Sequence, residues 1–349
     1  MNTTRIITLF LLIGLGLTII GGCEKVQNIV TIDEISQEEL DSLNVTMVYP
    51  NDCVGLAAYC TEFHIGVQKA KNEIGIKLTE LNGLENDPIA TEMILSEAAQ
   101  TSDLVLTAGY QMGSILESVA PKFPNVKFAI FDVVIDLPNV ASVNYKSNEG
   151  SFLVGSIAAL KTKSNKIGFI GGVDVPLIRE FEAGYIAGIH EINQDIEVIV
   201  KYISDDVTGF IQPDKAKEIA LTLYDSGVDI IYVAAGGSGQ GVLEAAQEKM
   251  KYIIWVDSNG NHLAPGIVLT SMVKEISSSV QTIIHETVNG MYMPGIRFIG
   301  IEGGGVDYTL DEHNQLSLTN NIINQIENIK EKIIAGDIIV PDTVQLPRQ

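Results

Sequence analysis

Short apolar segments alternate with helical segments along almost the whole of this chain of 349 residues. The strands expected in the first half are nearly all apolar: 45–49, 76–81, 104–107, 127–131 and 141–144. The segments expected to be helical between them are 59–74, 90–99 and 114–120. A strand without polar alternation is buried on both faces, so the pattern predicts parallel sheets covered by helices, an α/β fold.

The same alternation repeats in the second half of the chain. It predicts five further strands, at 166–170, 197–203, 230–233, 252–256 and 267–270. The helices expected there are 177–192, 214–226 and 241–249. Two series of this kind predict two lobes with a ligand cleft between them. Functional residues are expected at the carboxyl ends of the strands, where ligands of parallel sheets gather.

The composition narrows the range of functions. Hydrophobic residues make up 46% of the chain and charged residues 19%, so a large core can be buried. The net charge of −22 argues against a nucleic-acid partner, which requires a basic surface. The five histidines are scattered, and no acid and base are paired in the sequence. We therefore expect no metal, no cofactor and no enzymatic activity.

The N-terminus indicates export. Residues 1–22 combine one basic residue, Arg5, with an apolar stretch at 6–20, as in a secretory signal peptide. The apolar stretch is shorter than the roughly 20 residues of a membrane-spanning helix. The ending Ile-Gly-Gly before Cys23 resembles a bacterial lipobox and predicts lipidation of that cysteine, with residues 23–42 as a polar tether. The alternative is an ordinary signal peptide with a coincidental cysteine.

Two further cysteines, Cys53 and Cys60, are separated by seven positions. The compartment outside the cytoplasmic membrane permits a disulfide. Two buried free thiols are the equally probable alternative, and the sequence leaves the choice open.

Several residues at expected strand ends suit a polar ring-shaped ligand. Asp257 follows an apolar strand and can accept two hydrogen bonds from a vicinal diol, although a loop or capping aspartate is the alternative. Lys274 offers a charged donor, unless it is an ordinary solvated lysine. Phe210 lies in a polar loop and suits stacking, or else a minor core contact.

A glycine-rich turn at 234–241 reads Ala-Ala-Gly-Gly-Ser-Gly-Gln-Gly. Glycines at a strand–helix junction let the backbone approach a ligand closely. The turn lacks the Gly-Lys-Ser/Thr ending of a phosphate-binding loop and the last glycine of a hydrolase nucleophile turn. A tight turn without a ligand is the alternative.

Residues 166–176 carry the most specific motif, Lys-Ile-Gly-Phe-Ile-Gly-Gly-Val-Asp-Val-Pro, followed by Phe181 and Gly184. It resembles the signature Gly-Phe-(Ile/Val)-Gly-Gly-x-x-x-Pro-x-(Ile/Val)-x-x-Phe-x-x-Gly of the basic-membrane-protein (PnrA-like) lipoproteins. Segments 122–132, 148–155 and 235–241 are similar to further patterns of that family. The resemblance extends from about residue 45 to 305.

The resemblance implies a type I periplasmic-binding-protein fold, in which two Rossmann-like lobes joined by three crossings enclose one ligand. The N-terminal lobe would comprise 43–163 plus about 272–301, and the C-terminal lobe 164–271 plus about 302–345. A helix at 271–289 and a strand at 296–301 would return the chain to the first lobe.

The family also implies a function, that of a substrate-binding subunit of an ABC importer for a nucleoside or related ribose-containing ligand. Such a protein would be a monomer, lipid-anchored on the extracytoplasmic face of the cell membrane and partnered by a membrane permease. A ligand-sensing receptor for another small polar molecule, such as a sugar or nucleobase, is the main alternative, and a nucleoside hydrolase is a weaker one.

The residues expected to bind the ligand are Tyr59, Tyr110, Asp132, Phe210, Gly237, Asp257 and Lys274. One segment departs from the family pattern. Members carry Asp-x-Ser-Phe-Asn at the start of the first helix, where the Asp and Asn bond the base. Here Leu-Ala-Ala-Tyr-Cys stands at 56–60, which retains an aromatic residue and loses both polar ones. A preference for purines is therefore left open.

Overall fold

The computed structural model describes residues 43–84 and 87–343. The expected signal peptide, the lipidation site at Cys23 and the whole of the expected tether lie outside the described residues. Among the described helices, none is both long enough and apolar enough to cross a bilayer.

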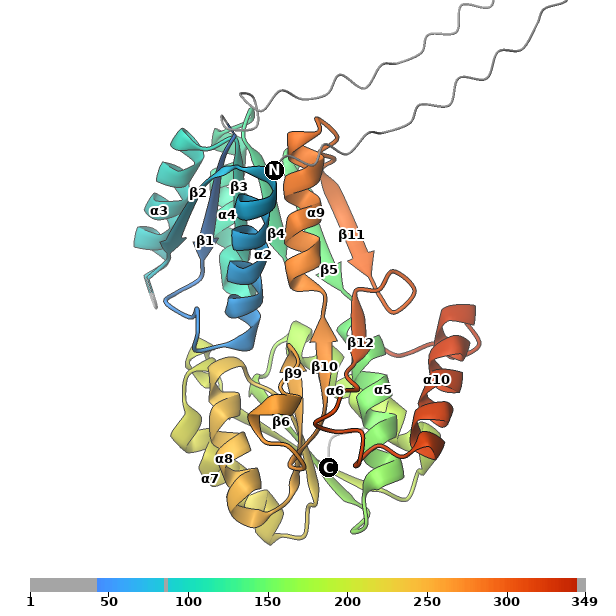
Figure 1. The fold of residues 1–349 in the computed structure, drawn as a ribbon. Coiled ribbons are helices and arrows are strands. Elements are labelled where there is room, and N and C mark those ends of the chain that lie inside the picture. The colour runs from blue at the N-terminus through green and yellow to red at the C-terminus, as the bar shows by residue number, and fades with distance from the viewer. Residues whose placement is uncertain (1–42, 85–86, 344–349) are drawn as a thin grey trace, which may run out of the picture. The chain divides into compact units, whose positions relative to one another are not determined.

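The first sheet has six parallel strands in the order β11-β5-β4-β3-β1-β2. Their bounds are β1 (Asn44–Tyr49), β2 (Lys77–Asn82), β3 (Leu104–Ala108), β4 (Lys127–Phe131), β5 (Val140–Tyr145) and β11 (Gly295–Ile299). The helices of this part are α2 (Ala58–Ile74), α3 (Pro88–Thr101), α4 (Gly113–Val119) and α9 (Ile276–Val288). Helix α2 packs beside α9, and α3 packs beside α4 (Figure 1).

The second sheet has the order β12-β10-β9-β8-β6-β7, and only its edge strand β12 is antiparallel to its neighbour. Its strands are β6 (Lys166–Val173), β7 (Glu197–Ser204), β8 (Ile230–Ala234), β9 (Tyr252–Asp257), β10 (Val268–Lys274) and β12 (Val306–Tyr308). The helices are α5 (Ser147–Lys161), α6 (Pro176–Ile192), α7 (Pro213–Asp225), α8 (Gly239–Lys249) and α10 (Asn320–Ala335).

The chain passes between the two sheets three times, after β5, after β10 and after β11. Two parallel sheets with three crossings confirm the predicted fold class. The exact lobe boundaries stay a prediction.

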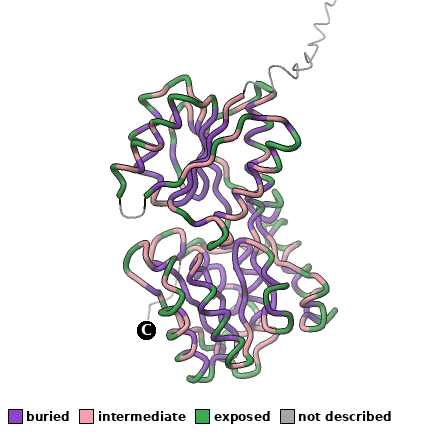
Figure 2. The backbone as a smooth tube through the Cα atoms, turned by 60° about the vertical axis from the view of Figure 1, so that its left-hand side comes forward, coloured by how far each residue is buried: buried purple, intermediate pink, exposed green. Residues whose placement is uncertain are grey.

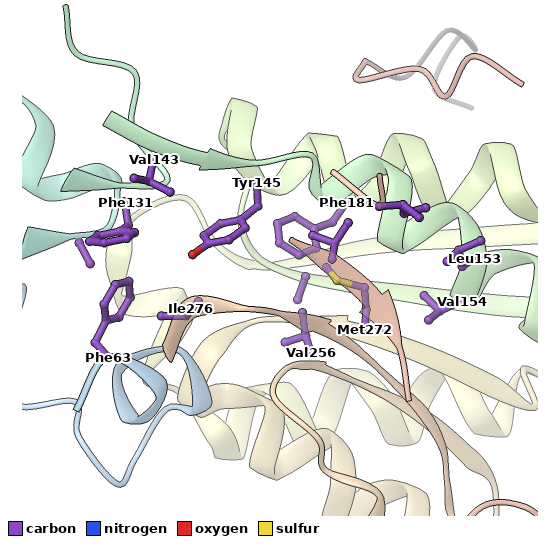
Figure 3. Packing of buried hydrophobic residues seen from close by; sticks show 14 of the residues in the cluster. Phe63, Phe131, Val143, Tyr145, Leu153, Val154, Phe181, Val256, Met272 and Ile276 are labelled. Carbon is purple, nitrogen blue, oxygen red and sulfur yellow. The ribbon is translucent and has the colours of Figure 1, made fainter. Parts of the chain in front are cut away.

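The central strands of both sheets are buried, and exposed residues lie mostly on the surrounding helices and loops (Figure 2). Phe63 of α2 faces Phe131 of β4, with ring centroids 4.9 Å apart (Figure 3). Such edge-to-face pairs fix helices on a sheet more specifically than aliphatic contacts do. This packing holds the start of α2 next to the end of β4, where the candidate site lies.

Gly184 of the family-like motif and Gly188, four residues further on, allow two helices to pack closely. A Cβ atom added to Gly184 or Gly188 of α6 would lie 2.1 Å from a backbone oxygen of α5, that of Asn148 or Phe152. Only glycine permits this close approach of two helix backbones. The rest of the motif, from Phe169 to Gly172, belongs to β6.

One predicted element is wrong in part. The segment expected to be helical from residue 271 begins instead as the second half of β10, and α9 starts at Ile276. Residues 271–273 pair with β9 and residues 272–274 pair with β12, and the Ser271 carbonyl also accepts a hydrogen bond from the Thr309 amide. The long-range pairing with β12 therefore extends the strand at the expense of the helix.

Candidate ligand-binding site

A pocket lies at the carboxyl ends of strands from both sheets. From the first sheet come the loop after β1, the start of α2, the turn after β3 and Asp132 after β4. From the second come α6, the loop around Phe210, the turn after β8, Asp257 at the end of β9 and Lys274 at the end of β10. Strand ends from two sheets converge here, as expected for ligand sites in parallel α/β proteins.

Six of the seven predicted residues line this pocket: Tyr59, Tyr110, Asp132, Phe210, Asp257 and Lys274. The seventh, Gly237, is not among the lining residues, and its neighbour Gly236 is. A Cβ atom on Gly237 would lie 3.2 Å from the carbonyl oxygens of Leu56 and Phe210, so this glycine lets two loops pack together. The structure brings the predicted residues together, while their role in binding stays a prediction.

A buried ionic cluster forms the polar end of the pocket. Lys274 Nζ lies 2.8 Å from Asp132 Oδ2 and 3.9 Å from Asp257 Oδ1. The Lys274 and Asp132 side chains are only 2% and 1% exposed. Burial alone would lower the pKa of Lys274, but the neighbouring carboxylates outweigh it and the pKa is raised. Lys274 is therefore a permanent cation between two carboxylates.

The pKa of Asp257 differs from that of an exposed aspartate. Burial raises its pKa to about 6, although Lys274 opposes the rise. Both Asp132 and Asp257 have left-handed backbones, with φ of 61° and 67°. Residues other than glycine adopt this conformation rarely, and it is often retained at functional sites. Two carboxylates placed in this way at adjacent sheet ends indicate a site shaped for a purpose beyond packing.

Three aromatic rings surround the Lys274 ammonium. Its Nζ lies 4.8 Å from the ring centre of Phe181, 5.5 Å from that of Tyr145 and 5.6 Å from that of Tyr59. Cation–π contacts of this length stabilise a desolvated ammonium. Burial, followed by the charge of Asp132, raises the pKa of Tyr59 well above its ordinary value, so its hydroxyl remains a neutral donor.

Phe181 and Tyr145 had no predicted role in the site. Phe181 could have been found, because it belongs to the family-like motif. Tyr145 had no signal, because it reaches Lys274 only through the pairing of distant segments.

An aromatic pair also lines the pocket. The rings of Tyr110 and Phe210 have centroids 6.4 Å apart, at an angle of 59°. The Phe210 ring rests on Gly172, where an added Cβ would lie 2.5 Å from its Cδ1 atom. The second glycine of the β6 motif thus makes room for this ring. Two rings at one pocket can contact the faces of a flat heterocycle.

The segment that departs from the family pattern is closed by a disulfide. Cys53 and Cys60 are bonded, and both line the pocket. Ala57, the residue before α2, makes no side-chain cap to the helix, so the disulfide fixes this helix start covalently. The structure thus decides the question left open by the sequence.

Two amide side chains also line the pocket, Asn51 after β1 and Gln111 after β3. Neither was predicted, since single polar residues in loops carry no pattern. In residues 43–84 and 87–343, no three metal-ligating side chains converge. The site combines aromatic faces with buried charges and suits the holding of a polar ring compound.

Comparisons with known proteins agree with this architecture. The sequence profile described as ABC transporter substrate-binding protein, PnrA-like, matches residues 43–344. A CD4+ T-cell-stimulating antigen of Listeria innocua is 36% identical over 69% of this chain and 70% of its own length. The ABC transporter nucleoside-binding protein BmpA of Lactococcus lactis is 34% identical over 70% of this chain and 73% of its own.

Among solved structures, an ABC transporter solute-binding protein from Aeropyrum pernix K1 superposes with a TM-score of 0.77. The superposition covers 86% of this chain and 94% of the Aeropyrum pernix chain, at 24% sequence identity. A likeness at this level of identity supports the fold alone.

The two sheets, the three crossings and the solved relative define a protein with the two-lobed type I periplasmic-binding-protein fold. Within that class, the chain belongs to the PnrA-like family of ABC transporter substrate-binding proteins. Proteins of this family work outside the cytoplasmic membrane and bind a small molecule for a membrane permease. They are binding proteins rather than enzymes.

Proposed function

We propose that this protein is the lipid-anchored binding subunit of an ABC importer and holds a nucleoside or a related ribose-containing ligand. The observation that carries the proposal is the presence, in one pocket, of the Tyr110–Phe210 ring pair and the Asp132–Lys274–Asp257 cluster. A nucleoside has one flat apolar part and one polyhydroxyl part. The pocket offers a group suited to each part, the ring pair for the flat part and the ionic cluster for the hydroxyl groups.

Each group has a defined role in this proposal. Asp257, when ionised, accepts hydrogen bonds from a ribose diol. Lys274 donates to a ligand oxygen and keeps Asp257 anionic by its charge. Phe210 and Tyr110 contact the faces of the base. The name of the nucleoside-binding relative from Lactococcus lactis supports the same ligand class.

The choice of base depends on residues 53–60, the part of the pocket that departs from the family pattern. Leu56 and the disulfide-bonded Cys60 stand where relatives are expected to have an Asp and an Asn, and Tyr59 keeps the aromatic residue. Asn51 and Gln111 are the neutral amides available to bond a base edge. Amides can both donate and accept, so we expect a broader choice of bases than a carboxylate would allow.

The test is calorimetry of the purified protein with purine and pyrimidine nucleosides, free bases and ribose. Nucleosides should bind more tightly than either of their halves, and Asp257→Asn should weaken ribonucleosides more than 2′,3′-dideoxynucleosides. Binding of free sugars or bases with no gain for the joined compound would instead favour a receptor for another small polar ligand. Binding of none of them would reject the proposal.

The anchor is tested separately. Cells that express the full chain should incorporate labelled fatty acid into it, and the protein should partition into detergent. Cys23→Ser should abolish both. Labelling of that variant would contradict lipidation at Cys23. Copurification with an ABC permease would support the importer role against a sensing role.

A further inference from the structure

A second pocket adjoins the first, and no function is assigned to it above. It shares Tyr110, Asp132 and Leu177 with the main pocket and extends past Glu180 of α6 to Phe298 of β11. Its volume is about 310 Å³, compared with about 120 Å³ for the main pocket. A ligand held in the main pocket can therefore extend a substituent past Asp132 into this side pocket.

The side pocket is rich in hydrogen-bond acceptors and has no cation of its own. Asp132 Oδ1 and the Tyr145 hydroxyl are buried, and neither has a partner within 3.5 Å among the described residues, although the hydroxyls of Tyr59 and Ser279 lie near enough to interact with the Asp132 carboxylate and with Tyr145, respectively. Glu180 contributes a second carboxyl group, and none of the described lining residues is basic. Arg179, the neighbour of Glu180, does not line the side pocket. Its guanidinium donates two hydrogen bonds to the Asp174 carboxylate instead.

The charges around Lys274 do not balance. Asp132, Asp257 and Glu180 all act on this one ammonium. Burial raises the pKa of Glu180 to about 7, against the opposing effect of Lys274, because no cation comes close enough to compensate for its desolvation. Glu180 is half-buried, and a ligand that supplies a positive donor would compensate for the desolvation of its carboxylate.

The walls of the side pocket suit a cation as well. Tyr110, Tyr145 and Phe298 present aromatic surface beside the two carboxyl groups. An ammonium group next to aromatic faces and carboxylates gains both cation–π and charge-assisted hydrogen-bond energy.

We propose that the side pocket is a subsite for a positively charged amino group carried by the ligand, with Glu180 as the residue that selects it. This inference rests on the proposed nucleoside function and narrows it to nucleosides that bear an amine. Asp132 Oδ1 is the second acceptor, and Lys274 holds that carboxylate in place through its Oδ2 atom.

Calorimetry at pH 8, where Glu180 is ionised, tests the subsite with two pairs of probes. One pair is 5′-amino-5′-deoxyadenosine and adenosine, and the other is N6-(2-aminoethyl)adenosine and N6-propyladenosine. At least one amine should bind roughly tenfold more tightly than its neutral counterpart. Glu180→Gln should remove that gain and leave the neutral compounds unaffected. Glu191→Gln, on the exposed end of the same helix, should keep it.

The outcomes separate the two proposals. Equal affinity of amines and neutral compounds in the wild-type protein overturns the subsite, and this comparison needs no variant. A gain that persists in Glu180→Gln, with an unchanged melting temperature, also overturns it. Binding of adenosine without any gain for the amines leaves the nucleoside function intact, whereas binding of no compound rejects both.

Discussion

Lys274 and Asp132 form a buried ion pair between residues 142 positions apart in the sequence, with 2.8 Å between Nζ and Oδ2. Lys274 ends a strand of the second sheet and Asp132 follows a strand of the first. The pair therefore joins the two sheets at the floor of the pocket. It ties the stability of the fold to the chemistry of the site.

Lys274→Met should destabilise the protein by about 3–5 kcal/mol, because it leaves two carboxylates buried without their cation. Urea denaturation at pH 7 measures the change. Lys122→Met, which removes a solvent-exposed partner of Glu92, is the matched control and should leave the unfolding midpoint almost unchanged. Adding Asp132→Asn to Lys274→Met should recover part of the loss. Equal midpoints for the two lysine variants would show that the buried pair does not stabilise the fold.

The stability contribution of Asp257 should depend on pH. Its pKa is raised from 3.8 to about 6 in the folded protein, so the folded state holds the proton more tightly than the unfolded chain. Wild-type stability is then lost as the pH rises from about 4 through 6, by on the order of 3 kcal/mol from this group.

Asp257→Asn cannot lose a proton, so its stability relative to wild type should increase over that pH range and level off above it. Denaturation curves at intervals from pH 4 to 8 measure the difference, with the exposed Asp195→Asn as control. Parallel curves for wild type and Asp257→Asn would refute the raised pKa.

Loss of the disulfide should affect both stability and binding. Cys53→Ser combined with Cys60→Ser should lower the free energy of unfolding by roughly 2–3 kcal/mol, since a short closed loop is opened in the unfolded chain. Ligand affinity should fall as well, because Ala57 and Tyr59 lie within that loop and line the pocket. A reductant should bring wild type to the midpoint of the double variant and leave the variant itself unaffected. A reductant-insensitive wild type would argue against this role.

Phe210→Ala should weaken nucleoside binding by about 1–3 kcal/mol, the usual contribution of one stacked base. Gly172→Ala keeps the Phe210 ring but should also weaken nucleoside binding, because the new methyl group would collide with that ring and displace it. Calorimetry with a nucleoside and with free ribose distinguishes the cause. Ribose binding should hardly change in either variant, and an equal loss for ribose would mean that the whole pocket is distorted.

Much of the fold could be predicted from local sequence, because apolar strands and amphipathic helices alternate so regularly. Helix α6 was predicted to within one residue at its start. The errors arise where distant segments decide the structure. The strand from Ser271 to Lys274 depends on pairing with β12, which has only three residues and no strong strand signal of its own.

The site was predicted through residues that stand directly after apolar strands, Asp132 and Asp257 among them. What the sequence could not predict is how such residues combine. The three rings around Lys274 come from α2, β5 and α6. Glu180 carried no signal, because a charged residue in a helix is ordinarily a solvent-exposed one and only the tertiary arrangement buries it.

The Cys53–Cys60 bond also sets an order of events in the life of the chain. Thiols stay reduced in the cytoplasm and pair in oxidising compartments beyond the membrane. The disulfide that closes the pocket-lining loop of residues 53–60 therefore forms only outside the cytoplasm. A precursor still in the cytoplasm would lack this covalent closure of the pocket. Maturation of the pocket thus coincides with arrival at the place where the protein captures its ligand.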